Sequence, residues 1–204
     1  MSLESEQLEL ESEQLEQAAA LEEAAEASLE DAIAPNTPLT FNCDGVEICT
    51  EKAEGRQRQI SARIQIPHPV DQVWQILTDY DHLADFIPNL AKSRKISHPK
   101  GGIRLEQVGT QSLLKFKFCA RVVLDMVEQF PHQLDFQMVE GDFKKFFGSW
   151  QLQPSADGQG TDLRYVVSVL PPLAMPVGMI ERRLKEGLVS NLSAIRQRAD
   201  ALYC

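Results

Sequence analysis

The sequence has few of the residues that mark common classes of functional site. Its four histidines are scattered, three of them lie beside prolines, and no HExxH or other metal-ligand spacing occurs. It also lacks a GxSxG nucleophile elbow and a glycine-rich loop of the kind that cradles phosphate. We therefore expect no metal, no cofactor and no catalytic residue of these kinds.

Cysteines and long apolar runs are also scarce. The four cysteines, Cys43, Cys49, Cys119 and Cys204, form no CxxC pair. With no secretory signal, they favour free thiols in a reducing compartment, with a Cys43–Cys49 disulfide as the alternative. No apolar run approaches the roughly 18 residues of a membrane span. The acidic N-terminus has no arginine, unlike an organelle transit peptide, so we expect a soluble, cytoplasmic protein.

Positive charge is absent from the first part of the chain. Residues 1–34 contain eleven acidic residues and no lysine or arginine, whereas the rest contains 19 acidic and 20 basic residues. The folded part is therefore almost neutral, which argues against a nucleic-acid partner. Residues 3–9 and 10–16 are identical, but their leucines do not follow a heptad seam. We predict that residues 1–38 form an acidic, partly helical or disordered tail and linker; the alternative is an arm that docks a protein partner.

Residues 173–202 predict one long amphipathic helix. Pro176 suits its first turn, and no later proline interrupts it. About 27 helical residues would span roughly 40 Å. Apolar residues recur at steps of three and four along it, namely Val177, Ile180, Leu184, Leu188, Leu192, Ile195, Ala199 and Leu202. Gly187 lies on or near this stripe, where either close packing or space for a ligand would explain a glycine that costs about 1 kcal/mol relative to alanine.

The residues before this helix alternate between apolar and polar, as in strands with one buried face. A helix from Pro69 to Leu77 and a shorter one ending at Pro88 interrupt the alternation. Short turns between successive strands favour antiparallel pairing. Strands are expected at residues 46–50, 57–66, 92–97, 103–111 and 115–128, around 134–138 and 150–152, and at 163–169.

Three segments carry a resemblance to a known family: IPHPVDQVWQILTDYDHLADFIPNL, VEGDFKKFFGSWQL and the closing amphipathic helix. They resemble the START-like (SRPBCC) superfamily, in its polyketide cyclase/dehydrase and lipid-transport branch. This branch includes coenzyme-Q-binding START-domain proteins, and the first two segments are similar to cyanobacterial and chloroplast members. The resemblance covers residues 46–203 and implies an α+β helix-grip fold over residues 39–204, with a curved antiparallel sheet wrapped round the C-terminal helix.

A strongly bent sheet cannot touch a straight helix along its whole length, so the fold leaves room for a cavity with apolar walls. The resemblance, in which a hollow interior is usual, favours such a cavity. The alternative is a core that these side chains fill completely. The predicted wall consists of Phe116, Phe118, Val122, Leu124, Phe136, Met138, Trp150, Tyr165 and Val167, with Leu184 and Leu188 from the helix.

Three predicted loops are unusually apolar, and two lysines lie within one of them. Aromatic rings beside lysines suit a membrane interface, so these loops form a hypothetical gate that touches a bilayer as a lipid-like molecule passes. The alternative is that they plug the end of the core. The gate residues are Phe86, Ile87, Phe143, Phe146, Phe147, Leu173 and Met175.

Polar anchors inside the cavity would come from Arg104, Glu106, Glu140 and Asp142. Arg104 and Glu106 share one strand face, so cross-strand ion pairing on the solvent side is the alternative. Asp142 follows Gly141 and is equally a turn residue.

Three functions remain open from the sequence. The first is a non-enzymatic carrier of an apolar small molecule, with an isoprenoid quinone, lipid or pigment implied by the resemblance. The second is an aromatase/cyclase or dehydrase that acts on a polyketide-like substrate, which would need acid and base groups in the cavity. The third is an interaction module that uses the acidic tail.

Overall fold

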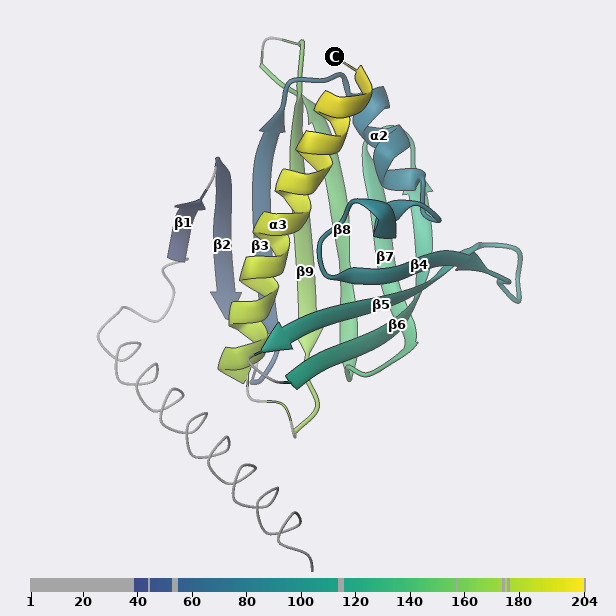
Figure 1. The fold of residues 1–204 in the computed structure, drawn as a ribbon, viewed down its shortest axis with the longest axis vertical. Coiled ribbons are helices and arrows are strands. Elements are labelled where there is room, and N and C mark those ends of the chain that lie inside the picture. The colour runs from purple at the N-terminus through teal and green to yellow at the C-terminus, as the bar shows by residue number, and fades with distance from the viewer. Residues whose placement is uncertain are drawn as a thin grey trace, which may run out of the picture.

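The computed structural model describes residues 39–43, 45–52, 55–113, 116–156, 158–173, 175 and 177–203. These residues form one antiparallel sheet of nine described strands, a long helix that crosses its concave face, and two short helices (Figure 1). One short helix packs beside the long helix, and the other contacts an edge strand. The predicted acidic tail, residues 1–38, lies outside the described residues.

The elements follow one another in a simple order. The strands are β1 (Leu39–Cys43), β2 (Val46–Lys52), β3 (Arg58–Ile66), β4 (Leu90–Ile96), β5 (Ile103–Leu113), β6 (Phe116–Gln129), β7 (Gln133–Gly141), β8 (Lys145–Pro154) and β9 (Thr161–Leu170). The helices are α2 (Val70–Thr78), the 3-10 helix η1 (Leu83–Asp85) and α3 (Val177–Tyr203).

The sheet has the strand order β1-β2-β3-β9-β8-β7-β6-β5-β4, so the last strand pairs with the third. Successive strands from β4 to β9 are joined by short turns and pair antiparallel, as adjacent strands in a meander do. The segment with α2 and η1 carries the chain from β3, in the middle of the sheet, to the edge strand β4. This crossover explains why two helices follow a strand that would otherwise lead directly into a hairpin.

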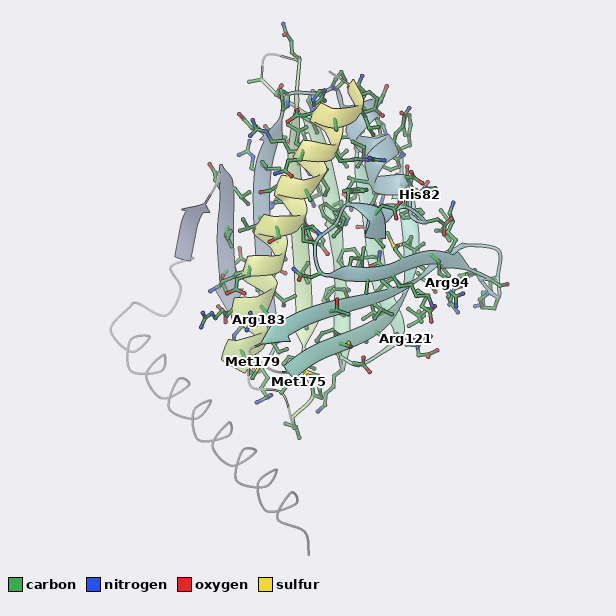
Figure 2. All side chains as sticks on the ribbon, viewed as in Figure 1. His82, Arg94, Arg121, Met175, Met179 and Arg183 are labelled. Carbon is green, nitrogen blue, oxygen red and sulfur yellow. The ribbon has the colours of Figure 1, made fainter. Side chains whose placement is uncertain are left out.

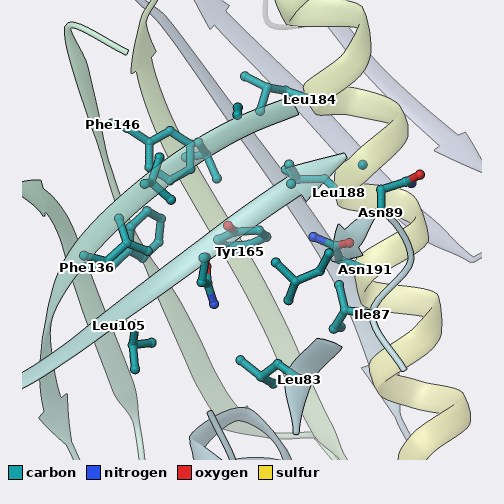
Figure 3. Close-up of a pocket in the computed structure, with 18 of the residues that line it drawn as sticks. Leu83, Ile87, Asn89, Leu105, Phe136, Phe146, Tyr165, Leu184, Leu188 and Asn191 are labelled. Atoms are coloured by element: carbon teal, nitrogen blue, oxygen red, sulfur yellow. The ribbon is translucent and has the colours of Figure 1, made fainter. Parts of the chain in front are cut away.

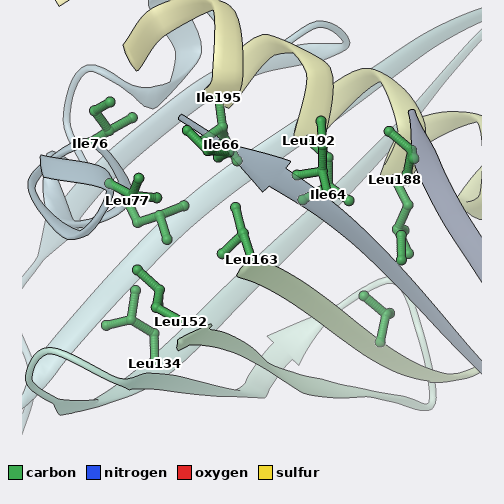
Figure 4. Packing of buried hydrophobic residues seen from close by; sticks show 14 of the residues in the cluster. Ile64, Ile66, Ile76, Leu77, Leu134, Leu152, Leu163, Leu188, Leu192 and Ile195 are labelled. Atoms are coloured by element: carbon green, nitrogen blue, oxygen red, sulfur yellow. The ribbon is translucent and has the colours of Figure 1, made fainter. Parts of the chain in front are cut away.

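The core lies between α3 and the concave face of β3, β9 and β8 (Figure 4). Ile64 and Ile66 of β3 point toward Leu192 and Ile195 of α3, and all four side chains are almost completely buried. Burying an aliphatic side chain of this size stabilises the fold by about 1.5–3 kcal/mol. α3 therefore lies firmly along β3, with further contacts to β2 and α2.

The other half of the sheet curls away from α3. In Figure 1, β5 and β6 cross in front of the remaining strands instead of lying flat beside them. Close packing at Gly148 in β8 accompanies this curvature, because a Cβ atom there would lie 1.9 Å from the backbone oxygen of Val166 and 2.7 Å from the ring of Phe136. Only glycine permits such an approach between neighbouring strands.

The predicted fold class is confirmed: an α+β helix-grip fold with a curved antiparallel sheet, a long C-terminal helix and two short helices after β3. Two local predictions were incomplete or wrong. Strand β1 was not predicted, and residues 145–148 belong to β8, whereas a loop was expected over 143–148. Within the described part of the chain, no helix is long and apolar enough to cross a bilayer. Cys49 and Cys119 are free thiols.

Candidate ligand-binding cavity

A cavity of about 590 Å³ lies between α3 and the curled half of the sheet (Figure 3). Its size falls within the range of roughly 300–1,000 Å³ that is typical of small-molecule sites. Most of the residues around it are apolar and come from β5 to β9, from α3 and from the loop between η1 and β4. The cavity exists because α3 packs along β3, and within the described residues it makes no comparable contact with β5 or β6.

Aromatic rings cover one side of the cavity. Trp150 and Tyr165 are register partners on β8 and β9, and their rings stack with centroids 3.6 Å apart. Phe136 of β7 lies 5.9 Å from the Tyr165 ring and 5.5 Å from Phe146, which stacks in turn on Phe143. These contacts run continuously across three strands. Stacked and tilted rings in contact keep one another in fixed orientations, so this wall is rigid.

α3 supplies the opposite wall. Leu184, Gly187, Leu188 and Asn191 lie one turn after another on the side of the helix that faces the hollow. A Cβ atom built on Gly187 would meet no atom within 4 Å outside its own helix, so the sheet does not approach it closely. Of the two explanations that the sequence left open for Gly187, the structure favours space inside the cavity.

The mouth of the cavity lies between the first turns of α3 and the loop that leads into β4. Three residues on the cavity wall are exposed to solvent there, Pro88 and Asn89 from the loop and Met179 from α3. Met175, Met179 and Arg183 gather at this end of α3 beside the ends of β5 and β6 (Figure 2). Arg183 also lines the cavity and donates a hydrogen bond of 3.0 Å to Glu186.

Tyr80 closes the cavity near α2. Its hydroxyl donates a hydrogen bond of 2.7 Å to Glu128, which is not one of the lining residues. Burial, together with the acceptor Glu128, raises the pKa of Tyr80 far above its ordinary value, so the phenol stays neutral. The Tyr80 carbonyl accepts a 2.6 Å hydrogen bond from Ser93, which ties this end of the wall to β4.

Most of the predicted wall residues lie on the cavity. Val122, Leu124, Phe136, Trp150, Tyr165, Val167, Leu184 and Leu188 all line it. Met138 shares the inward face of β7 but packs against the core beside the cavity. Phe116 and Phe118 belong to β6, and their side chains are outside the described part of the structure.

The predicted gate residues do not form one unit. Ile87, Phe143, Phe146 and Met175 line the cavity. Phe86 instead packs against the core, with the Arg198 guanidinium 5.5 Å from its ring centroid. Phe147 and Leu173 are exposed, at 39% and 74% of their surface. Phe147 points outward because it follows the inward-facing Phe146 in a strand, where successive side chains alternate between faces.

The four predicted polar anchors lie outside the cavity, and this assignment was wrong. Leu105 and Gln107 of β5 face the hollow, so the alternating residues Arg104 and Glu106 must face the other side of the sheet. There Arg104 donates to both carboxylate oxygens of Asp125, its register partner. This bidentate hydrogen bonding lowers the pKa of Asp125.

Glu106 is the centre of an ion-pair cluster on that outer face. Its carboxylate lies 2.6 Å from Lys92, 2.9 Å from Arg121 and 2.7 Å from Arg94. Hydrogen bonds from these cations, Lys92 foremost, lower its pKa to about 2. The other two predicted anchors bind Arg121: Glu140 pairs with its guanidinium, and Asp142 accepts from its backbone N–H at 2.6 Å.

Two polar side chains that line the cavity, Gln107 and Asn191, were not identified from the sequence. Tyr165, which also lines it, was predicted for the wall. Strand alternation from Leu105 predicts Gln107, and the helical step from Gly187 and Leu188 predicts Asn191. Among the described residues that line the cavity there is no Asp, Glu, His, Lys or Cys. Nor does the described part of the chain contain a cluster of three or more metal-ligating side chains.

A curved antiparallel sheet, closed by a C-terminal helix over an apolar hollow, defines a START-like helix-grip domain. A family model described as polyketide cyclase/dehydrase and lipid transport matches residues 66–193, which is most of this domain, and the chain belongs to that family. A comparison with curated protein sequences found no match.

Solved structures of low sequence identity share the fold. A STAR-related lipid transfer protein from Xanthomonas axonopodis is 14% identical, with a TM-score of 0.66 over 82% of this chain and 99% of that one. Human STARD10 is 9% identical, with a TM-score of 0.63 over 87% of this chain and 78% of that one. The Zhui aromatase/cyclase from a Streptomyces species is 17% identical, with a TM-score of 0.59 over 71% of this chain and 94% of that one.

Proposed function

We propose that this protein binds a hydrophobic small molecule in the cavity under α3 and acts as its carrier or chaperone. The observation that supports this most directly is the cavity itself, which is about 590 Å³ in volume and lined mainly by apolar side chains. Transfer of apolar ligand surface from water into such a site yields about 25 cal/mol for each Å² that is buried. The entropy cost of binding then reduces this gain.

The carrier role is favoured over an aromatase/cyclase or dehydrase. A cyclase of this family would need groups that take up and release protons near the substrate. The ionisable side chains among the described lining residues are Tyr80, Tyr165 and Arg183. The Tyr80 hydroxyl is engaged by Glu128, Arg183 is paired with Glu186, and burial raises the pKa of Tyr165 far above neutrality. None of the three is an effective base at neutral pH.

The ligand classes implied by the resemblance remain part of this proposal: an isoprenoid quinone, another lipid or a pigment-like molecule. A cytoplasmic location is likewise proposed. The acidic tail as a docking arm for a protein partner stays a separate prediction, because residues 1–38 are outside the described part of the chain.

The end of the domain at which α3 begins also has features that suit contact with a bilayer. Leu173 is 74% exposed in the loop before α3, and Phe147 is exposed at the adjacent start of β8. Lys144 donates its backbone N–H to the carbonyl of Leu170, so the two segments lie side by side. Exposed apolar groups near lysines are typical of membrane-surface sites. We therefore include peripheral membrane contact at this end in the proposal.

Extraction of the purified protein tests the carrier function. Full-length protein from its native host should release an apolar molecule into organic solvent, detectable by mass spectrometry. A Gly187→Trp variant should lose this molecule, because the new indole would enter the cavity. The Gly187→Ala variant is the matched control and should retain it. If the wild-type protein carries no apolar molecule and binds no apolar fluorescent probe, the carrier function is excluded.

Liposome co-sedimentation tests the membrane contact. A Phe147→Ser, Leu173→Ser double variant should bind vesicles less than the wild type does. Val127→Ser is the matched control, since Val127 is 58% exposed but follows the cavity-lining Met126 and so lies on the outer face of β6. Equal sedimentation of the wild type and the double variant would remove membrane contact from the proposal and leave ligand binding intact.

A further inference from the structure

Three uncharged polar side chains interrupt the apolar wall of the cavity. Gln107 comes from β5, Tyr165 from β9 and Asn191 from α3, so they lie on three different sides of the same hollow. Figure 3 shows Tyr165 and Asn191 directed into the cavity from the sheet and the helix. Polar groups that converge on an apolar site from separate elements commonly orient a ligand.

The Tyr165 hydroxyl has no hydrogen-bond partner among the described residues. Its ring stacks on Trp150, with centroids 3.6 Å apart, and lies 5.9 Å from the ring of Phe136. The residue retains accessible surface although protein surrounds it, because that surface faces the cavity. A hydroxyl that faces an apolar hollow and has no protein partner is available for a hydrogen bond to a ligand. Since burial keeps this phenol protonated, it can donate to a ligand oxygen.

A short chain of hydrogen bonds determines how Gln107 faces the cavity. Ser93 uses its one hydroxyl hydrogen to donate to the Tyr80 carbonyl at 2.6 Å. Its oxygen can therefore only accept from Gln107, whose Nε2 lies 3.2 Å away. The amide is thereby oriented with Nε2 toward Ser93, which leaves Oε1 as an acceptor. A ligand hydroxyl would satisfy this oxygen.

Asn191 interrupts the apolar stripe of α3. It lies one turn after Gly187 and one turn before Ile195, both of which line the cavity. Its carboxamide has no hydrogen-bond partner within the described part of the chain, although it can donate two hydrogen bonds and accept two. An aliphatic residue would continue the stripe at less cost, since a polar group placed against an apolar hollow loses hydration.

The lack of charged side chains among the described residues of the interior disfavours an ionic ligand group there. The described lining residues contain one cation, Arg183, at the mouth, and Glu186 already pairs with it. A carboxylate or ammonium group deeper in the cavity would meet no opposite charge. Burying such a group without a partner costs far more than burying a neutral one.

We propose that the cavity selects an uncharged, mainly apolar molecule that carries a hydroxyl or carbonyl oxygen. Tyr165 and Asn191 donate hydrogen bonds to this oxygen, and Gln107 accepts one where the ligand group is a hydroxyl. This inference rests on the proposed function and narrows its ligand class. It makes Tyr165 a determinant of specificity rather than a packing residue alone.

Four probes with one ring system test the proposal: pyrene, 1-hydroxypyrene, 1-acetylpyrene and 1-pyrenecarboxylate. Their dissociation constants are measured by fluorescence with the full-length protein, at a pH where the probe phenol is protonated. At least one of the two neutral oxygen-bearing probes should bind about fivefold tighter than pyrene, which corresponds to one net hydrogen bond. The carboxylate should bind more weakly than pyrene.

Variants assign the preference to its residues. Tyr165→Phe keeps the ring on Trp150 and should bind pyrene as the wild type does, but the preference for the oxygen-bearing probe should fall severalfold. Tyr203→Phe is the matched control, because its hydroxyl donates to Gln75 at 3.0 Å, outside the cavity. In thermal unfolding without a probe, Tyr165→Phe should be as stable as the wild type or more stable, since no bond of its hydroxyl is lost.

The outcomes distinguish failure of the proposed ligand selectivity from failure of the carrier function. Equal binding of pyrene and both neutral derivatives, tighter binding of the carboxylate, or an unchanged preference in Tyr165→Phe would each overturn this inference while the carrier function stands. Failure of every probe, pyrene included, would overturn the carrier function as well.

Discussion

The indole of Trp150 and the phenol of Tyr165 lie face to face in the wall of the cavity, with centroids 3.6 Å apart and ring planes 6° apart. The second tryptophan, Trp74, is in a different environment. It lies on α2, is nearly buried, and meets the Phe130 ring edge-on at 5.3 Å. Only Trp150 lines the cavity.

Tryptophan fluorescence should therefore report on the cavity through one residue. In a Trp74→Phe variant, the remaining tryptophan emission comes from Trp150. Titration with an apolar probe such as pyrene should quench this emission strongly. In Trp150→Phe, where emission comes from Trp74, quenching should be much weaker. Equal quenching in both variants would place the probe outside the cavity.

The empty space beside Gly187 leads to a prediction about stability. Gly187→Ala should raise the free energy of unfolding by about 1 kcal/mol, because alanine is the better helix former and its methyl group meets no neighbour. Urea denaturation followed by circular dichroism measures this difference. A loss of stability would mean that the sheet contacts this turn of α3 after all.

Gly148 should respond to the same substitution in the opposite way. A methyl group there would lie 1.9 Å from the backbone oxygen of Val166, which cannot move without distorting β9. Gly148→Ala should therefore destabilise the protein by about 3 kcal/mol or more. Gly109→Ala is the control, since its nearest contacts would be at 3.8 and 3.9 Å. Thermal unfolding of the two variants should differ clearly.

The ion pairs of Glu106 predict a dependence of stability on pH. Its pKa is about 2 in the folded protein, below the ordinary 4.5, so as the pH falls the unfolded chain takes up this proton first. The stabilisation is complete above about pH 4.5 and is lost progressively toward pH 2. Glu106→Gln should be less stable than the wild type at pH 7, and the difference should shrink over this window.

Melting temperatures measured from pH 7 to pH 2 test this expectation. Glu140→Gln is a suitable control, because Glu140 is 68% exposed and, among the described residues, forms one ion pair, with Arg121. Its difference from the wild type should be smaller at every pH. A constant difference between the wild type and Glu106→Gln across the window would contradict the assignment.

Arg56 holds the loop before α3. Its guanidinium donates to the carbonyl of Met175 at 2.6 Å and to that of Pro172 at 3.3 Å, and Met175 lines the cavity. Arg56→Ala should loosen this loop and increase the dissociation rate of a bound pyrene probe severalfold, with a smaller effect on the association rate. Stopped-flow fluorescence measures both rates. Arg63→Ala is the control, since Arg63 pairs with Asp162 away from the loop.

Strand and helix periods were enough to predict most of the fold. Alternation along β3 and β6 and the stripe on α3 predicted the buried faces, because one side of each element must leave water. Strand β1, a five-residue edge strand at the start of the described residues, was missed. The start of β8 was assigned to a loop because charged Lys144 and Lys145 precede aromatic residues there, although the alternation of Phe146, Gly148 and Trp150 continues through it.

The apolar wall and Tyr165 were predictable for the same reason, but Gln107 and Asn191 were not identified. Charge directed attention to Arg104 and Glu106, whereas the strand places the less conspicuous Gln107 inside. Which face of β5 lies on the concave side of the sheet depends on the curvature of the whole sheet. The absence of a partner for the Tyr165 hydroxyl among the described residues depends on the tertiary structure around the cavity, so the local sequence could not show it.

The separation between α3 and the curled strands has a thermodynamic consequence. Along β3, the side chains of the protein fill the interior completely. Between α3 and the curled strands, they leave the cavity. An apolar ligand in the cavity would become part of the hydrophobic core. Its binding would therefore raise the free energy of unfolding by mass action. The melting temperature of the protein would then rise with the concentration of the ligand that is available to it.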